Sequence, residues 1–258
     1  MSDDVDPFPP EGPTTVDLAV PRSALVIVAH PDDAEFQAGA TLAKWARAGC
    51  VVHHLVLTDG SKGTWDPHKD PAELVEERRD EQRAAATALG GTGVVFLDWV
   101  DGELPVSTTG RGQVASVIRR LQPQVVVGHD PWKRYRLHPD HHAAGRLCVE
   151  GVVAARDPGF HRDQLTAGLV PHRPEALLLF EPDVANHAES ASEEDHATRL
   201  RALEAFSSQL ATTHLYKVGE GADPMEAWRT RERERLEHAG RWAGTGLAEP
   251  FRLIVDQL

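Results

Sequence analysis

The stretch ALVIVAHPDDAEF, residues 24–36, indicates both the fold class and the place to look for chemistry. Its first six residues form an uninterrupted apolar run, which is typical of a strand buried in a parallel sheet. The polar HPDD would then lie at the carboxyl end of that strand, where open α/β sheets bind their ligands. Two adjacent carboxylates at this place raise a question. What do Asp32 and Asp33 do together that one aspartate could not?

Strand-like and helix-like segments alternate along the rest of the chain. Further strands are expected at 51–57, 94–97, 124–128, 175–180 and 251–255. Helices are expected near 39–48, 70–89 and 114–121, from residue 139, and late in the chain at the apolar positions Leu200, Leu203, Phe206 and Leu210. Short apolar strands with helical crossovers predict one α/β, Rossmann-like domain: a mostly parallel sheet with helices on both faces. Residues 1–20, acidic and Pro-rich, are expected to form a disordered tail before a single domain at 21–258.

Composition excludes several classes of partner. The chain has 258 residues and a net charge of −13, whereas nucleic-acid binders usually carry a basic face. No apolar run is long enough to span a bilayer, and the N-terminus does not resemble a signal peptide. The two cysteines, Cys50 and Cys148, do not make a disulfide framework. We therefore expect a cytoplasmic protein without nucleic-acid or membrane partners. The sequence does not decide whether the chain forms a homo-oligomer.

Histidine and aspartate follow two of the expected strands in patterns suited to a metal. His30 and Asp33 are three residues apart at a strand-to-helix turn, so both can face one point. A His-rich loop follows strand 124–128, and its His141 lies three residues before Ala144 on the helix face expected to be buried. Three N/O ligands with an open position are the layout of a catalytic zinc site, and such a site can also hold iron, cobalt or nickel. The alternative for each stretch alone is an ordinary helix start. Two such stretches at two strand ends favour the metal.

Under the metal interpretation the two aspartates have different tasks. Asp33 binds the metal, while the side chain of Asp32 diverges from it and serves as general base toward a water of lowered pKa. His138, three residues before His141, could stabilise the oxyanion of a tetrahedral intermediate. The functions of His68, His129, His142 and His187 stay undecided at this point.

The pair AHPDDAEF and HPDHHAAGRL resembles the PIG-L/LmbE-like zinc-dependent N-deacetylases. That family includes deacetylases of N-acetylglucosaminyl-phosphatidylinositol and of the mycothiol and bacillithiol pathways. The resemblance runs from about residue 24 to about residue 255. It implies Zn²⁺ on His30, Asp33 and His141, with Asp32 as base and later acid, and His138 as a polarising group. It also implies that Arg78 and Asp101 contact the sugar or position the site. Arg136 stands where thiol-pathway relatives carry a tyrosine, with Tyr135 beside it, and either could take the contact of that tyrosine with the oxyanion.

These observations predict a zinc-dependent hydrolase that removes an acetyl group from an N-acetylated amino sugar, an N-acetylglucosaminide, or from a related small amide. A soluble glycoside is favoured over a membrane glycolipid because the chain is acidic. Two alternatives remain: an amidase of thiol S-conjugates, and a non-catalytic metal- or sugar-binding module. The long polar segment 58–70, TDGSKGTWDPHKD, could cover the site.

Overall fold

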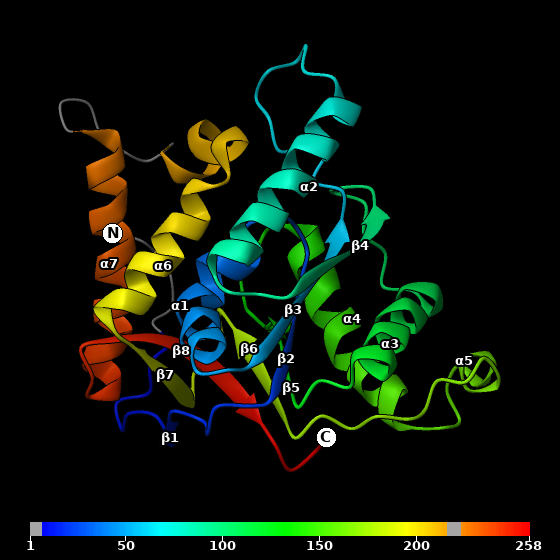
Figure 1. Cartoon of the computed structure of the whole chain (residues 1–258). Coiled ribbons are helices and arrows are strands. Elements are labelled where there is room, and N and C mark those ends of the chain that lie inside the picture. The colour runs from blue at the N-terminus through cyan, green and yellow to red at the C-terminus, as the bar shows by residue number, and fades with distance from the viewer. Residues whose placement is uncertain (1–6, 216–222) are drawn as a thin grey trace.

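An eight-stranded sheet forms the centre of the computed structural model, which describes residues 7–215 and 223–258 (Figure 1). The strand order is β1-β7-β8-β6-β5-β2-β3-β4, and neighbours are parallel except that β8 runs antiparallel to β6 and β7. The strands are β1 Thr15–Val16, β2 Ser23–Val28, β3 Val51–Thr58, β4 Gly93–Trp99, β5 Val125–His129, β6 Ala176–Phe180, β7 His187–Ala191 and β8 Leu247–Ile254. The prediction of an α/β domain with a mostly parallel sheet is confirmed.

Helices cover both faces of this sheet (Figure 1). Along β2, Val26 and Val28 face a core shared with α1 and α2, while Leu25 and Ile27 face a second core shared with α3 and α4. This alternation follows from the two-residue period of a strand. The helices are α1 Asp33–Arg47, α2 Pro71–Ala88, α3 Thr108–Leu121, α4 Pro139–Arg156, α5 Arg162–Thr166, α6 Glu193–Glu204 and α7 Pro224–Ala243, with the short turns η1 Ser207–Gln209 and η2 Leu210–His214.

The two segments singled out in the sequence meet at one edge of the sheet. The chain runs from β2 outward to β3 and β4, and then returns to the other side of β2 as β5. This reversal is the topological switch point at which α/β sheets bind ligands. His30 follows β2 and His129 ends β5, so the segments that carry the candidate ligands lie side by side.

Glycine allows α4 to approach this edge closely. A Cβ on Gly145 would lie 2.8 Å from the carbonyl oxygen of His129 and 2.9 Å from the backbone nitrogen of Pro131. Backbone atoms cannot move aside as the end of a side chain can, so a larger residue would push the start of α4 away from β5. The first turn of α4 carries His141, and its position therefore depends on this contact.

The late helix is shorter than predicted. It ends at Glu204, and Phe206 and Leu210 lie beyond it, although Phe206 is fully buried as its spacing indicated. Glu81 on α2 accepts hydrogen bonds from the Ser207 and Ser208 hydroxyl groups, and from the Ser208 backbone N–H at 2.8 Å. These bonds hold the chain in a tight turn, η1, which replaces the continuation of the helix.

The start of the chain also differs from the prediction. Thr15–Val16 pair with β7, the Phe8 ring stacks on Trp242 with centroids 4.9 Å apart, and the Trp242 indole N–H donates to the Pro9 carbonyl at 2.9 Å. Residues 7–20 of the predicted disordered tail therefore contact the domain because they supply a strand and an aromatic anchor. Residues 1–6 of that tail lie outside the described residues. None of the described helices is both long and apolar enough to cross a bilayer.

Candidate metal centre

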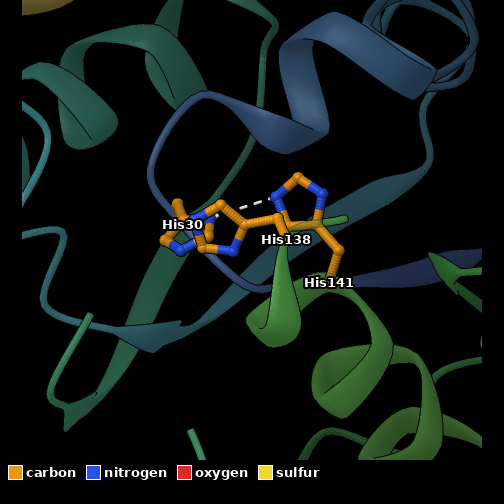
Figure 2. Close-up of side chains that lie close together, drawn as sticks. All are labelled: His30, His138 and His141. Atoms are coloured by element: carbon orange, nitrogen blue, oxygen red, sulfur yellow. Dashed lines mark hydrogen bonds between the residues drawn. The ribbon is translucent and has the colours of Figure 1, made fainter. Parts of the chain in front are cut away.

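The structure brings the three predicted metal ligands together. His30 follows β2, Asp33 begins α1, and His141 lies in the first turn of α4. His30 Nδ1 lies 3.2 Å from His141 Nε2 (Figure 2). Asp33 Oδ2 lies 3.4 Å from His30 Nδ1, and Asp33 Oδ1 lies 3.3 Å from His141 Nε2. Two nitrogen or oxygen atoms bound to one tetrahedral zinc ion are about 3.4 Å apart, and each of these three separations is close to that value, with one oxygen of Asp33 facing each imidazole.

Carboxylates hold the far side of the His30 ring. His30 Nε2 lies 3.1 Å from Asp101 Oδ1 and 3.2 Å from Asp140 Oδ2. Asp140 is itself fixed by the backbone N–H groups of Gly102 and Leu104, at 2.6 and 3.2 Å. Burial lowers the pKa of His30, but these carboxylates outweigh it and hold that pKa well above its usual value. Metal-binding histidines commonly donate their second ring N–H to a carboxylate, which leaves the first nitrogen free for the metal.

Asp33 is oriented from two directions. Its Oδ2 accepts the His30 backbone N–H at 2.8 Å and lies 3.3 Å from His129 Nε2. Burial raises the pKa of Asp33, yet the interactions of its carboxylate with the His141 and His129 rings outweigh burial and hold that pKa well below the usual value. A carboxylate held in its ionised form is a competent metal ligand. His129, which the sequence left undecided, therefore supports Asp33 in the structure.

Arg136 contacts the other nitrogen of the His141 ring. Its Nε donates to His141 Nδ1 at 2.8 Å, and its guanidinium group also pairs with Glu181. Burial lowers the pKa of His141 to about 4, so the ring is neutral near pH 7. A neutral ring that accepts at Nδ1 carries its proton on Nε2. Metal ligation through Nε2 therefore requires the guanidinium group to withdraw from Nδ1. Of the two residues considered for the position of the family tyrosine, Arg136 reaches the centre, whereas Tyr135 is 78% exposed.

Asp32 adopts an unusual backbone conformation beside these groups. Its φ is +93°, in the left-handed region, and its side chain makes no capping bond to α1. This observation argues against the ordinary helix-start interpretation of HPDD. The carboxylate is buried, and its Oδ2 lies 3.6 Å from a nitrogen of the Arg78 guanidinium group. Burial raises the pKa of Asp32 to about 7, although Arg78 acts in the opposite direction. A base with a pKa near the working pH can both take and return a proton.

Helix α2 holds Asp32 in place. Arg78 donates to the carbonyl of Pro31 at 2.8 Å and to the carbonyl of Gly60 at 2.9 Å. Gln82 accepts the Asp32 backbone N–H at 3.1 Å and donates to Glu35 at 2.8 Å. Two of these bonds fix the Pro31–Asp32 peptide through both its carbonyl oxygen and its N–H group. Sequence reasoning missed Gln82, because one glutamine on a helix has no spacing that marks it.

Arg78 and Asp101 already have partners within the chain. Arg78 is 3% exposed and Asp101 is 5% exposed. Asp101 faces His30 with one oxygen, and its other oxygen accepts the Lys62 backbone N–H at 3.1 Å. The structure thus places both at the centre in positioning contacts. A contact of either with a sugar stays a prediction.

His138 lies at the open side of the site. It occupies the N-cap position of α4 without a side-chain capping bond, it is exposed, and its ring approaches the His30 ring edge-on at 4.6 Å between centroids (Figure 2). Burial of part of the ring, and then the charge of His30, lower its pKa. A neutral ring can offer one N–H to a molecule in the site.

Three further histidines that the sequence left undecided, His142, His187 and His68, lie outside the set of candidate ligands. His142 Nε2 contacts the Arg136 carbonyl at 2.8 Å, and His187 contacts Thr15 and Glu189 at 2.7 and 3.0 Å. His68 lies exposed in the segment 58–70. Asp140 was overlooked because its place beside Pro139 is also that of an ordinary helix-start acid. Its position within HPDH was the only signal for it.

Comparison with known proteins agrees with this geometry. The PIG-L family model, described as GlcNAc-PI de-N-acetylase, matches residues 25–152. The diacetylchitobiose deacetylase of Thermococcus kodakarensis is 34% identical over 233 residues, which cover 90% of this chain and 83% of the relative. The chain belongs to the PIG-L family.

Two further relatives extend the comparison. The N,N'-diacetylchitobiose deacetylase of Pyrococcus horikoshii has a solved structure that superposes with a TM-score of 0.81, at 29% identity, over 91% of this chain and 84% of that one. A 4-oxalmesaconate hydratase of Pseudomonas putida is 29% identical over 62% of this chain and 61% of its own length. The relatives of this chain thus include proteins named for two different reactions, so the reaction is argued from the site.

Proposed function

We propose that this protein is a metal-dependent N-deacetylase that releases acetate from an N-acetylated amino sugar, an N-acetylglucosaminide. One observation carries the proposal: the buried carboxylate of Asp32 stands beside a cluster of potential ligands formed by the two imidazoles of His30 and His141 and the carboxylate of Asp33. Both diacetylchitobiose deacetylases reported above act, by their names, on an N-acetylated sugar.

His30, Asp33 and His141 would hold the metal. A divalent ion bound there polarises the amide carbonyl and lowers the pKa of a water molecule. We propose Zn²⁺ as that ion because two imidazoles and one carboxylate suit it, although a His₂Asp set also accepts iron, cobalt or nickel.

The chain's own residues would then move the protons. Asp32 takes a proton from the attacking water as the water oxygen bonds to the amide carbon. His138 donates a hydrogen bond to the carbonyl oxygen while negative charge develops on it. The C–N bond then breaks, and Asp32 returns the proton to the leaving amine. Water and amide are thus converted to acetate and free amine, with Arg78 and Gln82 keeping Asp32 in position.

Acetate release tests the proposal. We would incubate zinc-loaded protein with a panel of N-acetylglucosaminides, with a chelated sample alongside. Release that is lost on chelation and returns with zinc is expected. Stoichiometric zinc without acetate release, but with cleavage of a thiol S-conjugate, would instead support the amidase. Hydration of an unsaturated dicarboxylate would support a hydratase. Ligand binding with no turnover of any kind would support a binding module.

The Asp140→Asn variant is expected to bind zinc about 10- to 100-fold more weakly than wild type. The carboxylate of Asp140 faces His30 Nε2 at 3.2 Å, and loss of a carboxylate that orients a metal-bound histidine usually costs this much affinity. Zinc competition with a chromophoric chelator measures the change. Asp163→Asn, at an exposed aspartate of α5, is the matched control. Unchanged zinc affinity for Asp140→Asn would contradict the proposal that Asp140 orients a metal-bound His30.

The Gln82→Met variant is expected to keep stoichiometric zinc and a near-normal KM, but to lose about tenfold in kcat. Methionine fills similar space but leaves the Asp32 backbone N–H, which Gln82 accepts at 3.1 Å, without a partner in a buried site. An unsatisfied buried donor costs roughly 1–3 kcal/mol, some of which we expect to displace Asp32. Gln82→Glu retains an acceptor and should recover part of the activity. Arg83→Met, at an exposed position of α2, is the control. Equal kcat in Gln82→Met and wild type would refute the positioning role.

A further inference from the structure

The bond between Arg136 and His141 sets the protonation of the His141 ring. Arg136 Nε donates to His141 Nδ1 at 2.8 Å, and a second guanidinium nitrogen also contacts Nδ1. A guanidinium group carries only donors, so Nδ1 is the acceptor and the ring proton lies on Nε2. Nε2 is 3.3 Å from Asp33 Oδ1 and 3.2 Å from His30 Nδ1. The nitrogen proposed to bind the metal therefore carries a hydrogen atom in this arrangement.

Metal ligation reverses the roles of the two ring nitrogens. A ring that binds a metal through Nε2 carries its proton on Nδ1, and metal-binding histidines usually donate that second N–H to a carboxylate or a carbonyl. Arg136 has no acceptor to offer at Nδ1. Its positive charge also repels a divalent ion bound to the same ring. Arg136 therefore opposes metal binding, for two separate reasons, as long as it stays at Nδ1.

Glu181 supplies a carboxylate next to this nitrogen. The guanidinium group that contacts His141 Nδ1 also pairs with Glu181, so the gap between the two is the width of one guanidinium group and its hydrogen bonds. Glu181 Oε2 lies 4.0 Å from His129 Nδ1, and the His129 ring stacks on the His141 ring with centroids 4.5 Å apart. The Glu181 carboxylate thus contacts both neighbours of the His141 ring, Arg136 and His129.

The backbone at Glu181 is held in a costly conformation. Glu181 directly follows β6, at the carboxyl end of that strand, and its φ is +49°. A residue other than glycine is uncommon in the left-handed region, and such residues concentrate at functional sites. The residue before it, Phe180, pairs with His129 in the sheet, and the Glu181 side chain is only 20% exposed. This turn keeps the carboxylate beside the histidines.

We propose that metal binding exchanges the partner of His141 Nδ1: Arg136 occupies it in the metal-free chain, and Glu181 accepts its N–H in the metal-bound chain. A carboxylate has two oxygens, so Glu181 can accept from Nδ1 with one and keep Arg136 on the other. The ring loses a proton at Nε2 and gains one at Nδ1 by exchange with solvent, so its charge is unchanged. Glu181 is then a positioning residue for His141, and Arg136 is its competitor. This inference rests on the proposed function, because it takes His141 as a metal ligand.

The zinc affinities of two variants test the exchange, because the expected changes have opposite signs. Arg136→Met should bind zinc about tenfold more tightly than wild type, since no charge-assisted hydrogen bond has to break first. Glu181→Gln should bind zinc about 10- to 100-fold more weakly, since the carboxylate that orients the metal-bound ring is lost. Competition with a chromophoric chelator measures both. Arg134→Met and Asp183→Asn are the matched controls, because Arg134 and Asp183 form an ion pair between the same two loops. Both controls should keep wild-type zinc affinity.

NMR of the imidazole nitrogens tests the exchange on the wild-type protein, without reliance on the folding of a variant. The signals of His141 are identified by their absence from the His141→Gln spectrum. We expect the proton on Nε2 in the metal-free protein and on Nδ1 after zinc is added. A proton already on Nδ1 before zinc is added would overturn the exchange.

Failure of the exchange and failure of the proposed function give different results. If wild type binds zinc and releases acetate, but Arg136→Met binds zinc no more tightly, the exchange is wrong and the deacetylase stands. Wild-type affinity in Glu181→Gln would likewise overturn the role of Glu181. If both affinities shift as expected and no acetate is released, the exchange stands and the reaction is wrong. If wild type binds no zinc, the exchange and the metal-dependent function fail together.

Discussion

Asp32→Asn is expected to bind zinc like the wild type and to release acetate about 10²- to 10⁴-fold more slowly, the usual contribution of a general base. Asparagine has the shape of aspartate but cannot take the proton of the attacking water. It is preferred to alanine here because Asp32 has φ +93°, and asparagine tolerates the left-handed region better than alanine does. Zinc content and acetate release are measured on the same sample. Full activity at equal zinc would refute Asp32 as the base.

Asp33→Asn is expected to show the opposite pattern, with loss of zinc as the primary defect and loss of activity as its consequence. The Asp33 carboxylate lies 3.4 and 3.3 Å from the nitrogen atoms of His30 and His141 that would share the metal. A neutral amide is a much poorer ligand than a carboxylate. We therefore expect zinc affinity to fall by more than the roughly 10- to 100-fold that is typical when a residue that only orients a metal ligand is replaced. An asparagine oxygen can still accept the His30 backbone N–H, so the fold should persist. Competition titration of zinc and a thermal melt check both points.

The two variants also form a matched pair, because they differ by one residue position and carry the same change. If Asp33→Asn kept stoichiometric zinc at wild-type affinity, Asp33 would not be a ligand, and the division of tasks between the two aspartates would be wrong. If both variants lost zinc, Asp32 would belong to the metal ligands. These outcomes decide what the adjacent carboxylates do.

The overall architecture could be predicted because it depends on periodic apolar residues. The strands at β2, β3, β4, β5, β6 and β8 and the helices α1 to α4 follow from short apolar runs and from apolar spacing. The strand β7, His187–Ala191, escaped prediction because it contains polar residues whose partners come from distant parts of the chain. His187 contacts Thr15, and Glu189 accepts from Lys44. The early end of α6 likewise depends on Glu81, more than a hundred residues away.

The candidate centre could be predicted only in part. Histidine and aspartate three residues apart at a strand end indicated His30 and Asp33, and helix spacing indicated His141. The partners of these side chains could not be read in the same way. Asp140 and Asp101 both reach His30 Nε2, and His129 reaches Asp33, through the meeting of β2 and β5 and the loop after β4. Local sequence spacing does not report which carboxylate turns toward a ring from a separate segment.

A zinc titration of acetate release tests the central claim most directly. Chelator-stripped wild type and Asp32→Asn would each receive increasing zinc, and acetate release from N,N'-diacetylchitobiose would be followed at each step. The account predicts that wild-type activity rises in proportion to bound zinc and stops rising at one ion per chain, while Asp32→Asn binds the same zinc and stays nearly inactive. Acetate release that is independent of zinc, or equal in the two proteins at equal zinc, would contradict it.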